Sequence, residues 1–160
     1  MAISVRDFAQ GIIDSGLLSQ ERLSKFRASI EPDKNKHVET LAKELLKAKL
    51  LTKFQVGRII KGQHHGLVLA NNALLEKIGE GGMAHVYRAN HSGLDRAVAL
   101  KILKSEQSAD DDFAARFLRE ARIVAKLAHP NIIQIYDVNQ HEDYTYLSME
   151  FVAGGELSDR

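Results

Sequence analysis

Leu74-Leu-Glu-Lys-Ile-Gly79-Glu-Gly81-Gly82-Met-Ala84-His-Val86-Tyr-Arg-Ala is followed, after a turn at Ser92-Gly93, by Arg96-Ala-Val98-Ala99-Leu-Lys101. A glycine-rich turn lets backbone N–H groups come close to phosphate oxygens, because no Cβ stands between the main chain and the ligand. Spaced glycines alone are a weak signal, so the residues after them have to identify the kind of loop.

Two familiar phosphate-binding loops are excluded by the residues on the C-terminal side of the glycines. A dinucleotide-binding loop opens a helix and is followed about 20 residues later by an acidic residue. Here Val86 and Tyr87 favour a strand, and the segment from Val98 to Lys101 contains no carboxylate. A nucleoside-triphosphatase loop ends in Gly-Lys-Ser/Thr, which is absent. The remaining interpretation is a strand, a glycine turn and a second strand, followed by a third strand with one lysine.

This arrangement closely resembles the small lobe of protein kinases, which combines a glycine-rich loop with a Val-Ala-Ile-Lys strand. Gly79, Gly81 and Ala84 occupy the three glycine positions, and Val98-Ala99-Leu100-Lys101 matches the lysine strand. Ala84 departs from the third glycine, which could stiffen the tip of the loop and weaken its closure over phosphates. The resemblance implies that Lys101 contacts the α and β phosphates of ATP.

The composition fits a globular protein of one ordinary domain or two small ones, with 160 residues of which 44% are hydrophobic and 27% charged. No apolar run approaches the roughly 20 residues that span a bilayer, and the first residues do not resemble a secretory signal. The absence of cysteine excludes disulfides and fits a reducing compartment, so we expect a cytoplasmic protein without a membrane segment. Residues 1–70 carry a net charge of +5 and residues 71–160 carry −4, which suggests two units.

The first 66 residues have the apolar spacing and caps of four short helices. Ser4 and Ser19 can cap the first two, Val38 to Leu46 marks the third, and Thr52 with Gln55 forms a possible capping box for the fourth. We expect a helical bundle over 1–66 that serves as a packing, docking or regulatory module, and a linker over 67–72. A DNA-reading helix-turn-helix is the alternative, but the lysines do not gather on one recognition helix, so we expect no nucleic-acid partner.

Residues 73–160 are predicted to form five mainly antiparallel strands and one helix, in the order of a kinase small lobe. The strands are expected at Ala73–Gly79, His85–Ala89, Arg96–Leu103, Ile132–Val138 and Tyr144–Phe151. The helix should begin after acids at 110–112, which suit the positive end of its dipole, and end at Pro130. Its apolar face should include Phe113, Phe117, Val124 and Ala128. The fold class is therefore α+β.

Further site residues are implied by the kinase resemblance. Glu120 on the helix would pair with Lys101 and position the ATP phosphates, so these two are the expected catalytic residues, although pairing of Glu120 with neighbouring arginines on its own helix is the alternative. Ile78, Val86 and Ala99 would cover the adenine, Met149 would guard the back of its pocket, and main-chain groups of Glu150 and Val152 would bind its edge. Glu156 would reach the ribose. The set expected to bind ATP is Ile78, Gly79, Glu80, Gly81, Gly82, Met83, Ala84, Val86, Ala99, Lys101, Met149, Glu150, Val152 and Glu156.

This form of the glycine-rich loop, Gly79-Glu-Gly-Gly-Met83 followed by Val86-Tyr-Arg-Ala89, resembles that of bacterial serine/threonine kinases of the eukaryotic-like type. Leu50-Leu51-Thr52-Lys-Phe54-Gln55 and Gly62 resemble the helical preface of planctomycete-type kinases. The catalytic base, the metal ligands and the activation segment of a large lobe are missing, so we expect no metal site and no phosphoryl transfer by these residues alone. In the complete kinase Mg²⁺ and a protein substrate would join ATP, and here self-association or a partner would cover the surface that meets the large lobe. The alternative is a stand-alone, pseudokinase-like scaffold.

Overall fold

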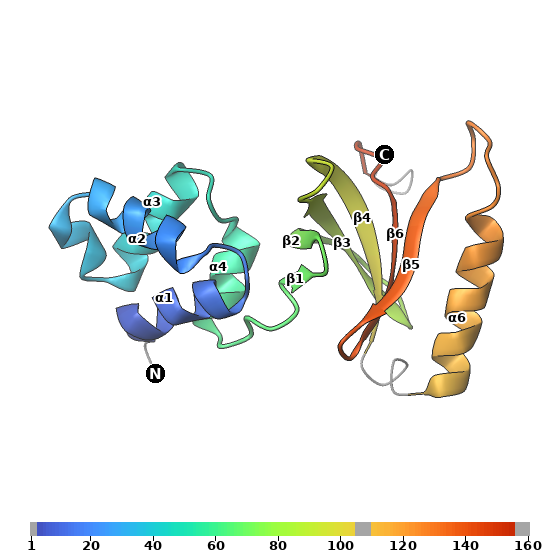
Figure 1. Ribbon diagram of the computed structural model, residues 1–160, viewed down its shortest axis with the longest axis horizontal. Helices are drawn as coiled ribbons and strands as arrows, with labels where there is room; N and C mark the ends of the chain where they lie inside the picture. The colour runs from blue at the N-terminus through green and yellow to red at the C-terminus, as the bar shows by residue number, and fades with distance from the viewer. Residues whose placement is uncertain (1–2, 105–109, 156–160) are drawn as a thin grey trace. The chain divides into compact units, whose positions relative to one another are not determined.

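The computed structural model describes residues 3–104 and 110–155. The chain forms two compact units, Met1–Glu76 and Lys77–Arg160, and the division falls inside strand β2 (Asn72–Glu80). Helices make up most of the first unit, and the second contains most of the sheet together with one helix (Figure 1). The predicted α+β class is confirmed.

The first unit contains the four predicted helices: α1 (Val5–Asp14), α2 (Gln20–Ser29), α3 (Val38–Lys47) and α4 (Lys53–Ile60). The predicted caps are also present, because Ser4 Oγ accepts a hydrogen bond from the Asp7 N–H (3.0 Å) and Ser19 Oγ accepts one from the Arg22 N–H (3.2 Å). A short 3₁₀ helix, η1 (Pro32–Asn35), lies between α2 and α3 and was not predicted. Its proline suits the first position of a helix, where no N–H is needed.

The core of the first unit is built from one apolar face of each helix. Its fully buried side chains include Phe8, Ile12, Leu41, Leu45, Ile59 and Leu67. Leu67 comes from segment 67–72, which we expected to be a linker. The same segment contains the two-residue strand β1 (Val68–Leu69), which pairs with the start of β2. Leu67 and Leu69 are therefore buried parts of the fold and not of a free linker. The division of the chain into functional modules stays a prediction.

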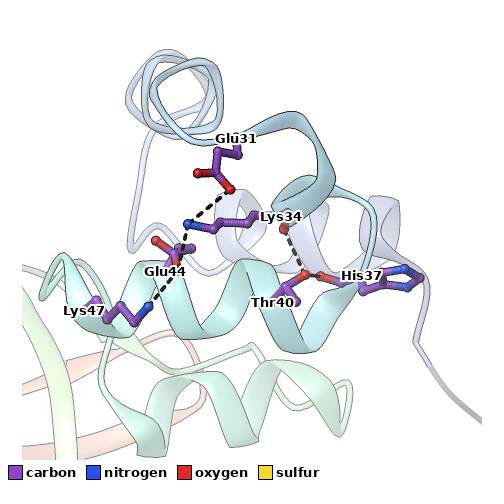
Figure 2. Close-up of polar contacts among 6 residues, drawn as sticks. All are labelled: Glu31, Lys34, His37, Thr40, Glu44 and Lys47. Atoms are coloured by element: carbon purple, nitrogen blue, oxygen red, sulfur yellow. Dashed lines mark hydrogen bonds and ion pairs between the residues drawn. The ribbon is translucent and has the colours of Figure 1, made fainter.

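Figure 2 shows the polar network that joins η1 to α3. Lys34 Nζ lies 3.8 Å from Glu44 Oε1, and Lys47 Nζ lies 3.0 Å from the same oxygen. The hydrogen bond from Lys47, aided by the charge of Lys34, lowers the pKa of Glu44. Thr40 Oγ1 donates to the carbonyl of Lys34 (3.0 Å), so both the main chain and the side chain of Lys34 hold η1 against α3.

The sheet has the order β1-β2-β3-β4-β6-β5 and all of its recorded pairings are antiparallel. Strands β3 (Ala84–His91), β4 (Arg96–Leu103) and β6 (Tyr144–Glu150) lie within two residues of their predicted positions. Strand β5 (Ile135–His141) begins and ends three residues later than predicted. The sheet has six strands instead of the predicted five because β1 adds one at the edge. A two-residue strand has too little alternation to be recognised in a sequence.

Helix α6 (Asp111–Val124) lies alongside β5 (Figure 1). Asp110 Oδ1 caps it by accepting from the Phe113 N–H (3.1 Å), as its acidic start suggested. Phe113 and Phe117 pack on the buried cluster of Ala84, Leu103 and Ala114.

The prediction for the C-terminal end of α6 was wrong. The helix ends at Val124, not at Pro130, and Val124 is 38% exposed, so it does not extend the packed face. The carbonyl of Ala125, just beyond the helix, accepts from Gln134 Nε2 (3.4 Å). The Gln134 side chain, just before β5, therefore supplies the hydrogen bond that a backbone N–H would donate to this carbonyl in a longer helix.

Candidate functional site

The register of three strands brings four of the predicted adenine and phosphate residues onto one face of the sheet. Val86 on β3 lies opposite Lys101 on β4, and Ala99 on β4 lies opposite Met149 on β6. Residues directly opposite each other point to the same face, as do residues two apart along a strand. Val86, Ala99, Lys101 and Met149 therefore share a face, with Ala99 buried and the other three half-buried. This face is apolar and carries the ammonium group of Lys101.

The glycine turn between β2 and β3 is closed by two backbone hydrogen bonds. The Gly81 N–H donates to the carbonyl of Ala84 (2.9 Å), and the Lys104 N–H donates to the carbonyl of Met83 (3.0 Å). A Cβ added at Gly82 would meet no atom within 4 Å, and at Gly81 it would lie 3.7 Å from the Ala84 carbonyl oxygen. Neither residue has a left-handed φ. Neither packing nor backbone conformation requires glycine at these two positions.

Gly79 lies directly against Val86, since a Cβ added at Gly79 would be 3.5 Å from the Cβ of Val86. That is an ordinary van der Waals distance, so a small residue would fit there. Ile78, the preceding residue, is 43% exposed. The glycine-rich segment thus begins beside the face that carries Val86 and Lys101.

Ala84 does not lie at the tip of the turn, where we expected it to affect loop closure. It is the first residue of β3, only 2% exposed, and packs with Leu103 and Ala114 beneath Phe113 and Phe117. Its methyl group therefore belongs to the contact between the sheet and α6.

Glu80 is the centre of an ionic cluster at the base of the turn. Its carboxylate lies 2.7 Å from Lys77 Nζ, 3.5 Å from His85 Nδ1 and 3.7 Å from Lys104 Nζ. The hydrogen bond and charge of Lys77, followed by the charges of His85 and Lys104, lower the pKa of Glu80. These contacts join β2, β3 and the residue after β4 beside the turn. The Glu80 side chain is thus engaged by the protein itself.

Lys77, His85 and Lys104 were absent from the predicted site. A turn over residues 81–84 places His85 across the hairpin from Glu80, so that contact could have been found from the hairpin register alone. The contact of Lys104 with Glu80 depends on the packing of the end of β4 against the turn. No local pattern in the sequence predicts that packing.

The structure does not bring Lys101 and Glu120 together as an ion pair among the described residues. Lys101 is half-buried on β4, whereas Glu120 is exposed on α6. Their pairing, and the assignment of both as catalytic residues, stays a prediction.

The predicted hinge comes directly after β6. Glu150 ends that strand, and its N–H donates to the carbonyl of Gln134 (2.9 Å). The next residue, Phe151, lies beneath the guanidinium of Arg88, whose Cζ is 5.9 Å from the ring centroid, a cation–π contact. Val152 is 62% exposed. Glu156, assigned to the ribose, lies outside the described residues.

Two further properties bear on the kind of site. In the parts of the chain that the structure describes, no three His, Cys, Asp or Glu side chains gather in a way that could hold a metal ion. Over the same residues, no helix combines the length and the apolar character needed to cross a bilayer. The candidate site therefore consists of a glycine turn, an apolar sheet face and one lysine.

A sheet of this order, with a glycine hairpin at its start, a lysine on the next strand and one helix against it, defines the class of a kinase-type small lobe. The comparison with known families agrees: residues 73–160 match the family described as the protein kinase domain. The chain belongs to the protein kinase family, of which it contains the N-terminal part.

Similar proteins are bacterial serine/threonine kinases. The chain is 41% identical over 104 residues to the serine/threonine-protein kinase PrkC of Bacillus subtilis, an alignment that covers 65% of this chain and 15% of that protein. It is 44% identical over 94 residues to PknJ of Mycobacterium tuberculosis, covering 59% and 16% respectively. The crystal structure of a mutant PknI kinase domain from M. tuberculosis superposes with a TM-score of 0.50 at 32% identity, covering 56% of this chain and 36% of that one. The chain thus spans only about 15% of the length of these two curated relatives.

Proposed function

We propose that this chain is the ATP-binding small lobe of a bacterial serine/threonine protein kinase, preceded by a helical docking or regulatory unit. The observation that carries the proposal is the shared sheet face of Val86, Ala99, Lys101 and Met149. An apolar surface with one cation beside a glycine turn suits a flat base attached to a chain of phosphates. We infer that the protein acts in the cytoplasm.

In this proposal ATP lies against the shared face. Val86 and Ala99, together with Ile78, cover the adenine, Met149 lies at the back of the pocket, and Lys101 holds the α and β phosphates. The main-chain groups of Glu150 and Val152 bind the adenine edge. Because the Glu150 N–H already donates to Gln134, we assign the Glu150 contact to its carbonyl oxygen. Glycine at 81 and 82 keeps side chains away from the phosphates, which accounts for glycine where the fold does not need it.

Phosphoryl transfer needs groups that this chain does not supply. Transfer depends on Mg²⁺ and on a residue that orients the attacking hydroxyl, and both functions belong to the large lobe of a kinase. We propose that Mg²⁺ and the protein substrate bind only when a large lobe is present, and that the 160 residues alone are inactive.

A second protein surface is expected to cover part of the lobe. Exposed apolar side chains follow each other from the end of α6 to the start of β5 and recur at the hinge: Ile123, Leu127, Ile132, Ile133 and Val152. Exposed apolar side chains that gather on a surface are typical of an interface. We propose that a large lobe covers it in the complete kinase and that self-association or another partner covers it otherwise. Light scattering should detect a concentration-dependent rise in mass, and a monomer at every concentration would contradict this.

Nucleotide binding is tested by titrating the chain with a fluorescent ATP analogue that carries a methylanthraniloyl group. Lys101→Met should weaken binding about tenfold or more, because a charge-assisted contact to phosphate is lost. Lys126→Met, an exposed lysine just beyond α6, is the matched control and should leave the affinity unchanged. Equal affinity in the wild type and Lys101→Met would reject the assigned phosphate contact, and an absence of binding would reject the nucleotide site.

Inactivity is tested separately, with radiolabelled ATP and a generic protein substrate such as casein. We expect no transfer by the purified chain. Transfer that is lost in Lys101→Met would show that the small lobe alone is sufficient and would overturn this part of the proposal.

A further inference from the structure

A groove between α1 and α2 lies entirely within the helical unit. It has a volume of about 450 Å³, and a shallower hollow of about 400 Å³ shares Ser24, Arg27 and Asn35 with it. The two hollows therefore adjoin at the Arg27–Asn35 pair. We name this groove, lined by α1, α2 and η1, the α1–α2 groove.

The floor of the α1–α2 groove is apolar, the residues around it are mostly polar, and two of these are arginines. Ala9 and Leu23 are buried at the bottom, and Val5 and Ile13 are half-buried beside them. Arg6 from α1 and Arg27 from α2 supply the charge, and neither hollow has an aspartate or glutamate in its lining.

Nearby carboxylates are engaged elsewhere. On α2 and beside or within η1, Glu21 pairs with Lys25, Glu31 with Lys34 and Asp33 with Lys36. On α1, Asp7 accepts from the hydroxyl of Ser4 (2.6 Å) and Asp14 accepts from Gln10 Nε2 (2.7 Å), and neither lines the groove. Among the ion pairs of the described residues, none involves Arg6 or Arg27. An arginine at the edge of a groove, without a carboxylate partner, is complementary to an anion.

Arg27 is held in place before any ligand arrives. Its Nε–H donates to Asn35 Oδ1 (3.1 Å), and Asn35 Nδ2 donates back to the carbonyl of Arg27 (2.9 Å). This pair of hydrogen bonds uses the Nε–H and fixes the guanidinium plane. A preorganised guanidinium loses less entropy when it binds a carboxylate than a mobile one does.

We propose that the α1–α2 groove binds an acidic peptide segment of a partner protein, with an apolar side chain on the floor and a carboxylate on Arg27. The lining contains no aromatic residue on which a nucleic-acid base could stack, which disfavours single-stranded nucleic acid. The recessed apolar floor cannot enter a bilayer, which disfavours a membrane surface. This proposal rests on the docking role proposed above for the helical unit and names the kind of partner that the unit binds. It does not depend on the nucleotide site.

The test is fluorescence anisotropy with the full chain and a fluorescein-labelled peptide that alternates Glu and Leu. Saturable binding with a Kd below about 1 mM is expected, weakening as salt is added. A peptide with Lys in place of Glu, and one with Ser in place of Leu, should each bind at least about fivefold more weakly.

Two substitutions locate the site. Arg27→Gln and Arg6→Gln should each raise the Kd about fivefold or more. Arg6 is exposed and its side chain makes no hydrogen bond or ion pair to any residue that the structure describes. Arg6→Gln therefore keeps the test valid if Arg27→Gln loses stability with its bond to Asn35. Arg22→Gln, on the same helix but outside the lining, is the matched control and should not change the Kd.

The proposal is overturned if the Glu/Leu peptide does not bind, if Arg22→Gln weakens binding as much as the groove variants, or if the Lys/Leu peptide binds equally well. It is also overturned if a labelled oligonucleotide or anionic vesicles bind more tightly with the same dependence on Arg6 and Arg27. Binding of the methylanthraniloyl nucleotide by the same variants should be unchanged, which separates a failure here from a failure of the nucleotide site.

Discussion

Gln55 Nε2 donates a 2.6 Å hydrogen bond to the main-chain carbonyl of Leu74. Gln55 is only 3% exposed, and its Oε1 accepts from the Thr52 N–H (2.8 Å), so one side chain completes the cap of α4 and binds the start of β2. Thr52 Oγ1 adds a 2.6 Å bond to the carbonyl of Leu75. Both bonds lie within the first unit, and the strand they hold leads without a break into the glycine turn.

Gln55→Met should lower the free energy of unfolding by about 2–3 kcal/mol, because it keeps the side-chain volume but leaves the buried Leu74 carbonyl without its donor and removes the capping box. Urea unfolding followed by circular dichroism measures this. Gln63→Met, at an exposed position, is the matched control and should change stability by less than about 0.5 kcal/mol. A similar loss in both variants would show that the buried bond contributes little.

Ala84→Gly, which restores the glycine typical of kinases, should lower stability by about 1 kcal/mol. It removes a buried methyl group from the contact with Leu103 and Ala114 and places glycine in a strand. Thermal unfolding measures the change. An increase in stability, or a gain in nucleotide affinity without loss of stability, would show that Ala84 acts on the turn and not on the core.

Gly82→Ala should leave the free energy of unfolding within about 0.5 kcal/mol of the wild type, since the added Cβ meets no atom within 4 Å. Its effect should fall on nucleotide affinity, where a methyl group obstructs the approach of phosphate. Gly57→Ala in α4, whose Cβ also meets nothing within 4 Å, is the control: it should raise stability by about 0.5–1 kcal/mol without changing nucleotide affinity. Unchanged nucleotide binding by Gly82→Ala would remove the ligand-based reason for this glycine.

The Glu80 carboxylate should titrate below its usual pKa of 4.5, and Lys77→Met should move the pKa back toward that value. A carboxyl group with a lowered pKa stabilises the folded state above its unfolded pKa, and the contribution is lost as the pH falls through the lower, folded value. A carbon-detected NMR titration of Glu80 measures both, with Lys126→Met as the control. The effect should be modest because the Glu80 side chain is 55% exposed. An identical titration in Lys77→Met would contradict the leading role of Lys77.

Local chemistry explains which parts of the fold could be predicted from the sequence. Each helix cap is a hydrogen bond between residues only three positions apart. The caps at Ser4, Ser19 and Thr52–Gln55 were therefore predicted, and they are present. Strands β3 to β6 each contain strand-forming residues over seven or eight positions between turn signals, which is long enough to be recognised. The end of α6 was missed: the helix stops at Val124, and the carbonyl of Ala125 accepts from Gln134, nine residues further along the chain.

The residues of the candidate site likewise fall into those that local sequence could predict and those that it could not. The shared face of Val86, Ala99, Lys101 and Met149 results from the registers of β3, β4 and β6, and the sequence alone places only residues two apart, such as Ala99 and Lys101, on one face. The cluster around Glu80 and the bond from Gln55 to Leu74 join residues whose proximity arises only from tertiary packing. No local pattern marks them.

The strand that both units share has a consequence for how such a gene can change. The match to the kinase family begins at residue 73, inside β2 and just before the two carbonyls that Gln55 and Thr52 bind. Replacing the preceding residues by an unrelated domain would leave those carbonyls without their donors. We therefore expect a fusion made at the family boundary to lose stability, so the helical unit and the first strand of the lobe form one structural block.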